Sequence, residues 1–581
     1  MDTPYIVARR PEDLLPFLPA LKGAAVIAVD SETTGLDAKM QRMRLLQLAF
    51  DNYPVIIIDC FSFLPDGFSV LKEILEGSSL KVMQNAKFDL SFLLHLGIKP
   101  SPVFDTMLAA QLLRSCGGPA RANLPALVLH YLNEELDKTE QVSNWQGELS
   151  SKQLAYAAKD ADILLRLHRA IDQDLQRNDL VSIAAIEFGC VSAVTDMEYH
   201  GVSLDTSGWR LLTAKTEQER DAALKILHEF SGEPDAQTSL LGAAEVVLDH
   251  NFDSNTYVQQ LLQSQGINVD STSRRDLYSY NEHPLVQALL AYRKAAKALS
   301  AFLYPFVGLI HPVSGRIHPD YRQIGASSGR MSCGDPNIQQ IPRDAAFRAC
   351  FVAPTGRKLV IADYSQIELR VAAEISRDNR MINAYKNNED LHRLTASLVS
   401  GIPAGDVTTQ QRQAAKAVNF GLIYGMGAAG LQTYAQTSYG VEMSLEQARA
   451  FRERFFRAYP GIASWHRLQQ QEKPAQGKTL AGRRFVFELD TGLSMLCNTP
   501  VQGTAADILK LALGILAKRL HGSSTYIIAA VHDEILLETD ASNAEDVAVL
   551  LKDAMEEAGN TILSSVPCLA EAAVADNWAG K

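Results

Sequence analysis

The sequence predicts a multidomain protein in which an α/β domain precedes a larger region of mixed helices and strands. The 581 residues exceed the span of one hydrophobic core, since a domain usually takes roughly 100 to 200 residues. Residues 24 to 172 combine strand patterns with helical stretches, whereas residues 185 to 300 have mostly helical periodicity. After residue 300, short apolar strand patterns bracket long helical stretches. These observations predict an α/β domain, a helical spacer or clamp, and an α+β domain.

The elements follow in order along the chain. The runs AAVIAV and YPVIIID predict two strands of the first domain, and the stretch LAYAAKDADILLRLHRAI predicts its last helix. Within the helical segment, the polar stretch SGEPDAQTSLLGAAE (231–245) predicts a loop tip. The later runs LVIAD and YIIAAVHDEILLE are the strand patterns of the second domain.

The composition indicates a globular enzyme without export or membrane signals. No run of about 18 apolar residues occurs, and the start MDTPYIVARRPEDLLP lacks the features of a signal or transit peptide. The seven cysteines are scattered without a CxxC pair, which favours reduced thiols over disulfides or zinc sites. We therefore expect a cytoplasmic location and no membrane partner.

The net charge of −12 argues against a nucleic-acid partner only if the charge is spread evenly. A protein that clusters acids around metal ions can keep a local basic track. The stretch from Arg316 to Arg348 and the pair Arg483 and Arg484 are candidates for such a track. The alternative is that these arginines form a solvated surface, and on charge alone this alternative is the stronger one.

Acidic and polar residues recur in pairs in the first domain, at spacings that bring each pair together. Residues two apart on a strand share a face, and residues four apart on a helix do the same. The pairs are Asp30 and Glu32 after AAVIAV, Asn85 and Asp89 in QNAKFDLSFLLHLG, and Tyr156 and Asp160 in YAAKDADILL. Four carboxylates and a tyrosine then predict a site for two divalent ions about 4 Å apart that activate water, with the tyrosine orienting it. Taken singly, each acid could instead be a turn residue or a solvated helix residue.

A second pattern occurs in RQAAKAVNFGLIYG, where four residues follow each other at spacings of four: Arg412, Lys416, Phe420 and Tyr424. On a helix each such step rotates by about 40°, so the four side chains form one drifting stripe. Two cations followed by two aromatic rings suit a triphosphate at one end and a base pair at the other. An amphipathic helix with snorkelling basic residues would show the same spacing.

Two further carboxylates lie at the ends of strand patterns in the second domain. LVIADYSQIELR runs into Asp363, with Glu368 five residues later, and YIIAAVHDEILLE places Asp533 and Glu534 between two apolar runs. Buried carboxylates need compensation, and two Mg²⁺ ions shared by Asp363 and Asp533 would supply it. Such ions would lower the pKa of a primer 3′-hydroxyl and neutralise the leaving pyrophosphate, which Lys416 could protonate.

Both patterns resemble known families. Residues 24 to 172 are similar to 3′→5′ proofreading exonuclease domains of the DEDDy type, which carry the same three pairs. The chain from about Gly315 onward resembles the A-family DNA polymerases, the bacterial DNA polymerase I and phage group, through SSGRMSCGDPNIQQIP, DYSQIELR, RQAAKAVNFGLIYG, NTPVQGTAAD and VHDE. The resemblance implies an RNase H-like α/β exonuclease domain followed by a right-hand polymerase. The implied ranges are 1–180 for the exonuclease and 181–581 for the polymerase, with the thumb at about 190–300, the palm at about 301–375 and 480–581, and the fingers at about 376–479.

The resemblance also implies roles for individual residues. Asp363 and Asp533 become metal ligands with Tyr364, and Glu534 lies close by. Glu368 would crowd a ribose 2′-hydroxyl, which favours deoxynucleotides. The implied nucleotide-binding residues are Arg412, Lys416, Phe420, Tyr424, Glu368, His392 and Gln366. The implied DNA-binding residues are Arg330, Asn337, Gln502, His532, Gly425 and Asn498 in the polymerase, and Leu36 and Asn85 in the exonuclease. The implied exonuclease residues are Asp30, Glu32, Asp89, Asp160 and Tyr156, of which the four acids bind metal.

The expected cofactor is Mg²⁺, two ions per site, with Mn²⁺ as a possible substitute. The expected partners are primer–template DNA, deoxynucleoside triphosphates and a single-stranded 3′ end, and no motif identifies a processivity factor. Phe420 predicts discrimination against dideoxynucleotides, because family members with tyrosine there accept them more readily. Ser494 stands where the family usually has arginine, which puts a minor-groove or template contact in doubt.

The chain starts directly at the exonuclease pattern, so we expect no removal of RNA primers from the 5′ side. Two other functions are compatible with parts of the sequence. One is a dedicated exonuclease with a vestigial polymerase domain, although such a relic would be expected to lose a palm acid. The other is a DNA-binding replication scaffold with neither activity, which would require both acidic groups to persist without use.

Overall fold

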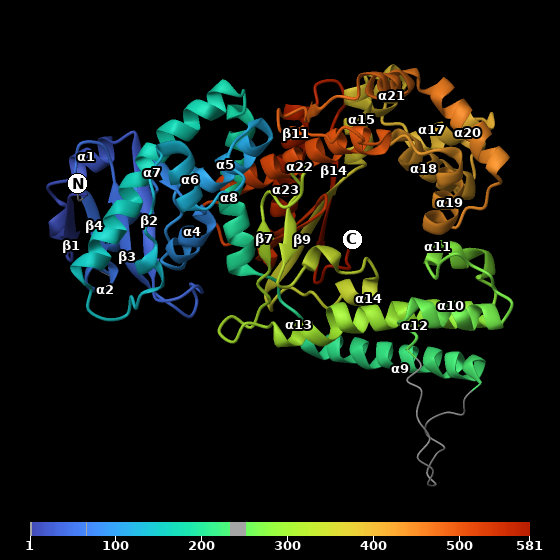
Figure 1. The fold of residues 1–581 in the computed structure, drawn as a ribbon, viewed down its shortest axis with the longest axis horizontal. Helices are drawn as coiled ribbons and strands as arrows, with labels where there is room; N and C mark the ends of the chain where they lie inside the picture. Colours follow the sequence, from blue (N-terminus) through green and yellow to red (C-terminus); the bar gives the residue numbers. More distant parts are fainter. Residues whose placement is uncertain (1–2, 65–66, 233–250) are drawn as a thin grey trace, which may run out of the picture.

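The N-terminal domain is built on one six-stranded sheet, in the blue part of the chain in Figure 1. The computed structural model describes residues 3–64, 67–232 and 251–581. The strand order is β1-β4-β3-β2-β5-β6; β3 is antiparallel to both neighbours and the other pairs are parallel. The strands are β1 (Tyr5–Ala8), β2 (Val26–Thr33), β3 (Met43–Ala49), β4 (Val55–Asp59), β5 (Leu80–Met83) and β6 (Val103–Asp105).

Both faces of this sheet are buried, which explains the continuous apolar runs. Successive residues of β4, such as Ile56 and Ile57, enter two different apolar cores, and a sheet covered on both faces needs apolar residues at every position. The covering helices are α1 (Leu18–Gly23), α2 (Cys60–Phe63), α3 (Phe68–Leu75), α4 (Ala86–His95), α5 (Thr106–Leu113), α6 (Leu124–Leu132) and α7 (Ser151–Arg177).

The strands predicted at AAVIAV and YPVIIID are confirmed as β2 and β4, and the last predicted helix is confirmed as α7. The other four strands were not predicted. The domain also begins before residue 24, because β1 pairs with β4 through the register Tyr5 to Val55.

The C-terminal region is organised around a four-stranded antiparallel sheet of order β12-β13-β9-β14. The runs LVIAD and YIIAAVHDEILLE are confirmed as strands of this sheet. Its strands are β9 (Arg357–Tyr364), β12 (Tyr526–Val531), β13 (Glu534–Asp540) and β14 (Ala570–Ala575). Two small hairpins accompany it: β7 (Asp320–Arg322) with β8 (Ser332–Gly334), and β10 (Gln476–Lys478) with β11 (Arg484–Val486).

Two helical groups border this sheet in Figure 1, with α9 and α12 on the side below it and α17 to α21 to its upper right. Helices on the first side are α9 (Thr206–Ser231), α10 (Asn255–Ser264), α11 (Arg274–Leu277), α12 (Pro284–Ala298), α13 (Tyr304–Gly308) and α14 (Ala345–Arg348). The second group comprises α15 (Ile367–Ser376), α16 (Asn379–Lys386), α17 (Leu391–Ser400), α18 (Thr409–Ile423), α19 (Ala428–Tyr439), α20 (Leu445–Ala458) and α21 (Pro460–Glu472). The loop tip predicted at 231–245 lies almost wholly outside the described residues.

Helix α8 (Val181–His200) joins the two regions, because it packs against α4 and α5 of the N-terminal domain and against β12 and α22 (Leu493–Arg519) of the C-terminal region. Helix α23 (Ala544–Ile562) lies beside α22 and covers β9 and β14. Among the described residues, α22 alone has the length and apolarity of a membrane span, and two thirds of its apolar window is buried within the protein. That burial is typical of a core helix.

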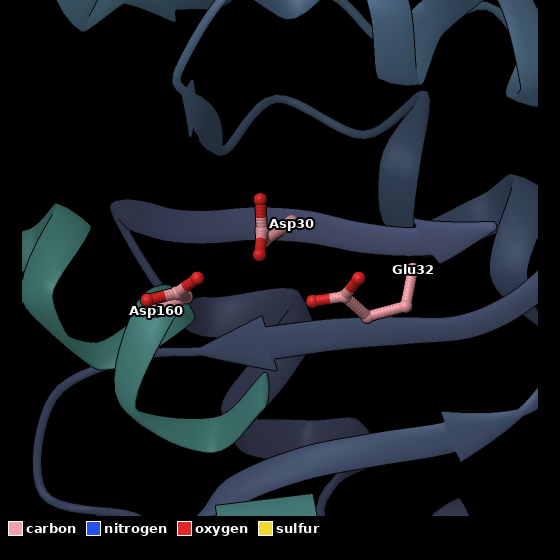
Figure 2. A group of neighbouring side chains, drawn as sticks. All are labelled: Asp30, Glu32 and Asp160. Atoms are coloured by element: carbon pink, nitrogen blue, oxygen red, sulfur yellow. The ribbon is translucent and has the colours of Figure 1, made fainter. Parts of the chain in front are cut away.

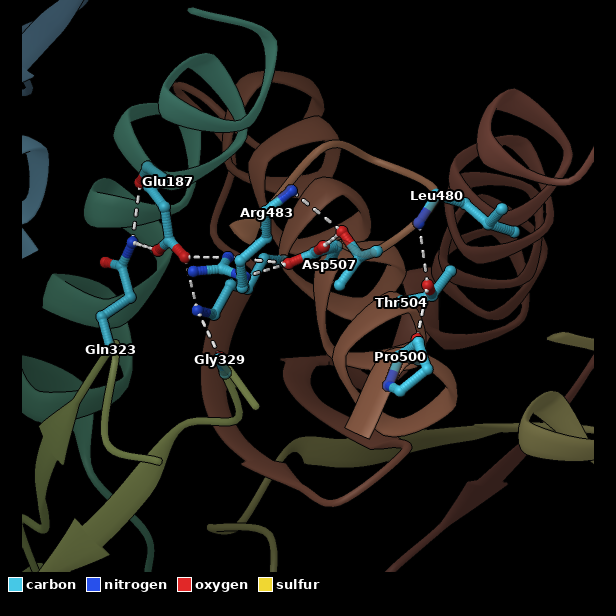
Figure 3. Close-up of polar contacts among 10 residues, drawn as sticks. Glu187, Gln323, Gly329, Leu480, Arg483, Pro500, Thr504 and Asp507 are labelled. Atoms are coloured by element: carbon cyan, nitrogen blue, oxygen red, sulfur yellow. Dashed lines mark hydrogen bonds and ion pairs between the residues drawn. The ribbon is translucent and has the colours of Figure 1, made fainter. Parts of the chain in front are cut away.

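Four fully buried charges cluster where α8 meets α22 (Figure 3). Arg483 forms ion pairs with Glu187 and Asp507, and Lys510 Nζ lies 2.6 Å from Glu187 Oε1. Burial alone would raise the pKa of Glu187, but Lys510 and Arg483 outweigh it and hold the pKa below its ordinary value. Two acids and two bases leave the cluster neutral, so each charge depends on the others.

We expect Glu187→Gln to lower the free energy of unfolding by about 3 to 5 kcal/mol, because it leaves one uncompensated positive charge in the cluster. The measurement is denaturant unfolding of the full chain. A matched control is Glu453→Gln, whose exposed ion pair with Arg457 should contribute about 0 to 1 kcal/mol. Equal effects of the two substitutions would contradict the importance of the buried charges.

Candidate active sites

The first candidate site lies on the face of β2 that packs against α7. Asp30 and Glu32 extend from β2 and face Asp160 of α7, as Figure 2 shows. Ligand oxygens of these three carboxylates all lie within 4.8 Å of one another. The predicted convergence of these three acids is therefore confirmed.

Asp89 lies at the edge of this group rather than within it. It is buried on α4, and its Oδ1 accepts a hydrogen bond of 2.5 Å from Ser31 Oγ. Its charge still raises the pKa of Asp30. The prediction that Asn85 and Asp89 share a helical face is wrong, because Asn85 precedes α4 with a left-handed backbone (φ 56°).

The clustered carboxyl groups of this site favour the binding of cations. Burial, followed by the charges of Asp30 and Asp160, raises the pKa of Glu32 to about 9. Burial also raises the pKa of Asp30 and brings that of Asp89 to about 7. Asp160 Oδ1 is buried and lacks a hydrogen-bond partner among the described residues. Clustered carboxylates, one of which has an oxygen without a hydrogen-bond partner among the described residues, suit divalent ions that prefer oxygen ligands.

The residues predicted to contact a single strand lie around this group. Leu36 projects from the loop between β2 and β3 with 86% of its surface exposed. Tyr156 lies one helical turn before Asp160 on α7, and burial raises the pKa of its hydroxyl. Lys138 donates hydrogen bonds to Tyr156 and Asp160, although it belongs to none of the three predicted pairs.

The second candidate site lies at the turn between β12 and β13. His532 occupies this turn with a left-handed backbone (φ 60°), and Asp533 follows it. The amide of Tyr364 donates to the carbonyl of Asp533 over 3.2 Å, which ties the turn to the end of β9 that carries Asp363. The structure thus brings the two predicted acids to the same edge of the sheet. Burial raises the pKa of the Asp533 carboxyl.

Several partners of these acids were not predicted. The Lys581 ammonium contacts the Asp363 carboxylate and donates to the carbonyl of Glu571. Glu534 is buried, where it accepts hydrogen bonds from Arg348 and from the Trp578 indole. Both of its oxygens are therefore engaged by protein groups. No local sequence pattern reveals these contacts, since the partners lie far along the chain.

Tyr364 cannot bind a metal through its side chain. Its hydroxyl is buried and donates to the Met555 carbonyl. The prediction that Arg483 belongs to a surface basic track is wrong as well, because its side chain is 3% exposed and lies in the cluster of Figure 3. Arg316 is not available for such a surface track either, because it forms an ion pair with the buried Glu538.

The predicted stripe lies along the half-buried face of α18. Arg412, Lys416 and Phe420 belong to the helix, and Tyr424 follows its last residue. Residues 417–419 and 421–423 between them are buried. Arg412 Nε lies 2.6 Å from Asp390 Oδ2, and Lys416 Nζ lies over the Tyr439 ring. The four side chains therefore do line one partly exposed surface.

Glu368 connects the end of this stripe to the remaining predicted residues. It accepts a hydrogen bond of 2.6 Å from the Tyr424 hydroxyl and pairs with Arg330. Gly425 follows with φ 75°, and a Cβ there would approach the Leu493 side chain to 2.8 Å. Only glycine combines that backbone with such close packing.

The other predicted nucleotide and DNA contacts differ in accessibility. His392 is almost fully buried beneath Phe420 and hydrogen-bonds Asn419, and burial lowers its pKa to about 4. Gln366 has a left-handed backbone at the start of α15. Asn337 caps the turn that follows it by accepting from the Gln339 amide.

Three residues at spacings of four lie on α22 near the same site: Ser494, Asn498 and Gln502. Asn498 Oδ1 is buried and has no hydrogen-bond partner within the described part of the chain. Pro500 lies inside the helix between Asn498 and Gln502, and Thr504 donates to the Pro500 carbonyl while accepting from the Leu480 amide (Figure 3). This face therefore carries an amide oxygen that is free for a ligand.

Comparison with known proteins assigns both sites to families. Residues 235–580 match DNA polymerase family A, and residues 5–176 match the 3′-5′ exonuclease family. The chain belongs to DNA polymerase family A. DNA polymerase I of Aquifex aeolicus (strain VF5) is 35% identical to it, with 100% of each chain covered. DNA polymerase I of Pseudomonas aeruginosa is 32% identical over 97% of this chain and 64% of that protein.

A solved structure shows the same architecture. The POL domain of Pol1 from M. smegmatis, in complex with DNA primer-template and dNTP, aligns with a TM-score of 0.79 at 26% identity and covers 99% of both chains. The predicted fold, an exonuclease domain followed by an A-family polymerase domain, is thereby confirmed. As a family A polymerase with an exonuclease domain, the chain carries out template-directed DNA synthesis with 3′-5′ proofreading.

Proposed function

We propose that the chain extends primer 3′ ends on a DNA template at the β9–β12–β13 site and removes mispaired nucleotides at the β2–α7 site. The observation that carries this proposal is the convergence of Asp30, Glu32 and Asp160 in one domain and of Asp363 and Asp533 in the other. Its substrates are primer–template DNA, deoxynucleoside triphosphates and single-stranded 3′ ends, in the cytoplasm.

Mg²⁺ is the proposed cofactor at both sites, since it binds through oxygen ligands such as one or two carboxylates together with substrate phosphates. Asp363 and Asp533 hold it in the polymerase, and Asp30, Glu32, Asp89 and Asp160 hold it in the exonuclease. When bound, the ions activate the attacking oxygen and neutralise charge on the leaving oxygen. Mn²⁺ has similar oxygen preferences and substitutes for it.

Protein side chains bind and position the substrates at the polymerase site. Arg412 and Lys416 bind the triphosphate, and Phe420 and Tyr424 position the base and sugar. Lys416 donates a proton to the leaving pyrophosphate. Glu368, fixed by Tyr424 and Arg330, blocks a ribose 2′-hydroxyl. Arg330, Asn498 and Gln502 contact the primer end, and the unpaired oxygen of Asn498 supports this assignment.

At the exonuclease site, Tyr156 orients the water that attacks the terminal phosphodiester. Leu36 lies against the bases of the single strand, since it projects with 86% of its surface exposed from the loop that follows Glu32 on β2. Ser31 keeps the Asp89 carboxylate in place through its hydrogen bond.

A time course on a 5′-labelled primer annealed to a longer template tests the proposal. With Mg²⁺, the primer should lengthen when the four deoxynucleotides are present and shorten when they are absent. Shortening under both conditions would favour an exonuclease with a silent polymerase domain. An unchanged primer under both conditions would favour a scaffold without either activity.

Phe420→Tyr should raise dideoxynucleotide incorporation relative to deoxynucleotide incorporation by about tenfold or more. A rate change of this size corresponds to the free energy of one added hydrogen bond in a partly buried site. Phe420 lies half-buried on the stripe of α18, so an added phenol hydroxyl can replace the missing 3′-hydroxyl as a polar partner. Chain-termination ratios measure the effect. Phe456→Tyr on α20 is the matched control, and an equal ratio in both variants would show that Phe420 does not face the sugar.

A further inference from the structure

Lys138 enters the exonuclease site from the segment before α7, outside all three predicted pairs. Its Nζ lies 2.6 Å from Asp160 Oδ2 and 3.1 Å from the Tyr156 hydroxyl oxygen. The same ammonium lies 5.3 Å from the centre of the Tyr156 ring. One cation therefore contacts both a carboxylate of the acidic group and the hydroxyl beside it.

The segment that carries Lys138 is anchored to the start of α7. The side-chain amide of Gln153 (Nε2) donates hydrogen bonds to Ser143 Oγ over 2.9 Å and to the Asn144 carbonyl over 3.2 Å. Glu140 pairs with Lys152 in the first turn of α7, and Trp145 is buried against the same domain. These contacts hold the segment in place, so the ammonium is positioned by the fold rather than by its flexible stem.

The position of Lys138 creates a competition for Asp160. Its charge lowers the pKa of Asp30 and of Glu32, against the larger effects of burial and neighbouring carboxylates. A divalent ion can bind Asp160 through Oδ1, which has no hydrogen-bond partner among the described residues, while Lys138 Nζ lies 2.6 Å from the other oxygen. The ammonium therefore repels an ion at this carboxylate, whereas the hydrogen bond from Lys138 to Tyr156 does not involve a metal ligand.

We propose that Lys138 is a positioning residue of the exonuclease, which weakens ion binding at Asp160 and holds the Tyr156 hydroxyl for the reaction. This inference rests on the proposed exonuclease function. Removal of the ammonium then has two effects of opposite sign. Ions bind more tightly because a competing cation is gone, and hydrolysis is slower because Tyr156 loses its donor.

The test compares Lys138→Met with the parent chain in two measurements. Calorimetric titration of the full chain with Mn²⁺ should show tighter binding, by about threefold or more, at the exonuclease ions. Those ions are identified as the ones lost in the variant Asp30→Asn/Glu32→Gln. At saturating Mn²⁺, kcat for degradation of single-stranded DNA should fall about tenfold or more with little change in KM.

Two further variants make the result specific. Lys138→Arg keeps a donor cation and should recover part of the lost kcat. Lys22→Met removes an exposed lysine on α1 of the same domain and should change neither quantity. Primer extension should remain unchanged in all three variants.

The remaining outcomes overturn the proposal. Unchanged ion affinity and unchanged kcat in Lys138→Met would show that the ammonium is a passive counter-ion. Weaker ion binding, with the rate restored by excess Mn²⁺, would show that Lys138 only supports the acids. Persistent degradation by the variant Asp30→Asn/Glu32→Gln would instead reject the exonuclease site itself, whatever Lys138 does.

Discussion

Replacing Asp533 with asparagine is expected to slow primer extension by about a thousandfold or more, while degradation of single-stranded DNA continues at the parent rate. Asparagine keeps the size of the side chain and the left-handed turn at His532, but it loses the negative charge. Ions held by Asp363 alone would bind weakly, and metal assistance supplies several kcal/mol to phosphoryl transfer, with each 1.4 kcal/mol worth about tenfold. Single-turnover extension with Mg²⁺ measures the loss.

A control for this experiment lies at the other end of the same strand pair. Asp540 ends β13 and forms an ion pair with Arg357, well away from the turn. Asp540→Asn should therefore leave extension within about twofold of the parent rate, since ion pairs with one exposed partner contribute little. If the Asp533 variant extends primers as fast as the Asp540 variant does, the polymerase site must lie elsewhere.

The exonuclease activity of the same preparation serves as a folding control. The two sites lie in different domains with separate cores, so a local change at Asp533 should not reach β2. Loss of both activities would indicate unfolding rather than removal of a metal ligand. Unchanged exonuclease with lost extension would separate the two sites functionally.

The sequence predicts strands that are uninterrupted apolar runs. It misses β3, whose run MRLLQLA contains Arg44 and Gln47, and it misses the shortest strands, for a physical reason. β2 and β4 are long apolar runs buried on both faces, and this pattern is visible locally. β5 has four residues and β6 has three, so neither contains a period that distinguishes a strand from a loop. Their strand conformation depends on pairing, of β5 with β2 and of β6 with β5, which is a property of the folded sheet.

The same distinction applies to the sites. The spacing of acids within motifs predicts that Asp30 and Glu32 share a face, because strand geometry sets that relation over two residues. Spacing does not predict that Arg348 and Trp578 donate hydrogen bonds to Glu534. It also does not predict that Arg483 is buried in an ion pair with Glu187. Those contacts join residues far apart in the chain, so they depend on how helices and strands pack rather than on local geometry.

Replacing Asp30 with asparagine and Glu32 with glutamine together is expected to reduce the exonuclease rate by about a thousandfold or more while leaving extension intact. Both carboxylates belong to the group whose oxygens lie within 4.8 Å of each other, so the change removes two of its three charges. Degradation of a single strand with Mg²⁺ measures the loss. Asp51→Asn, an exposed acid paired with Arg169 in the same domain, is the matched control and should leave the rate unchanged.

The same variant should be more stable than the parent chain when metal ions are removed. Burial, then Asp30 and Asp160, raises the folded-state pKa of Glu32 from 4.5 to about 9, so folding takes up a proton between these values. The contribution of Glu32 to the stability of the metal-free parent is therefore fully present below pH 4.5 and is lost as the pH rises toward 9. Glutamine carries no such penalty, so the advantage of the variant should grow across this window.

Thermal unfolding in EDTA at several pH values checks the sign of this effect. At pH 8 the variant should unfold about 2 to 4 °C above the parent, which corresponds to about 1 kcal/mol in a domain of this size. Added Mg²⁺ should raise the unfolding temperature of the parent more than that of the variant, because the parent keeps the buried acids of the exonuclease site whose charges the ions compensate. A variant that is less stable than the parent at pH 8 would show that the two carboxylates stabilise the domain. Their mutual repulsion would then not be a stability penalty that accompanies the metal site.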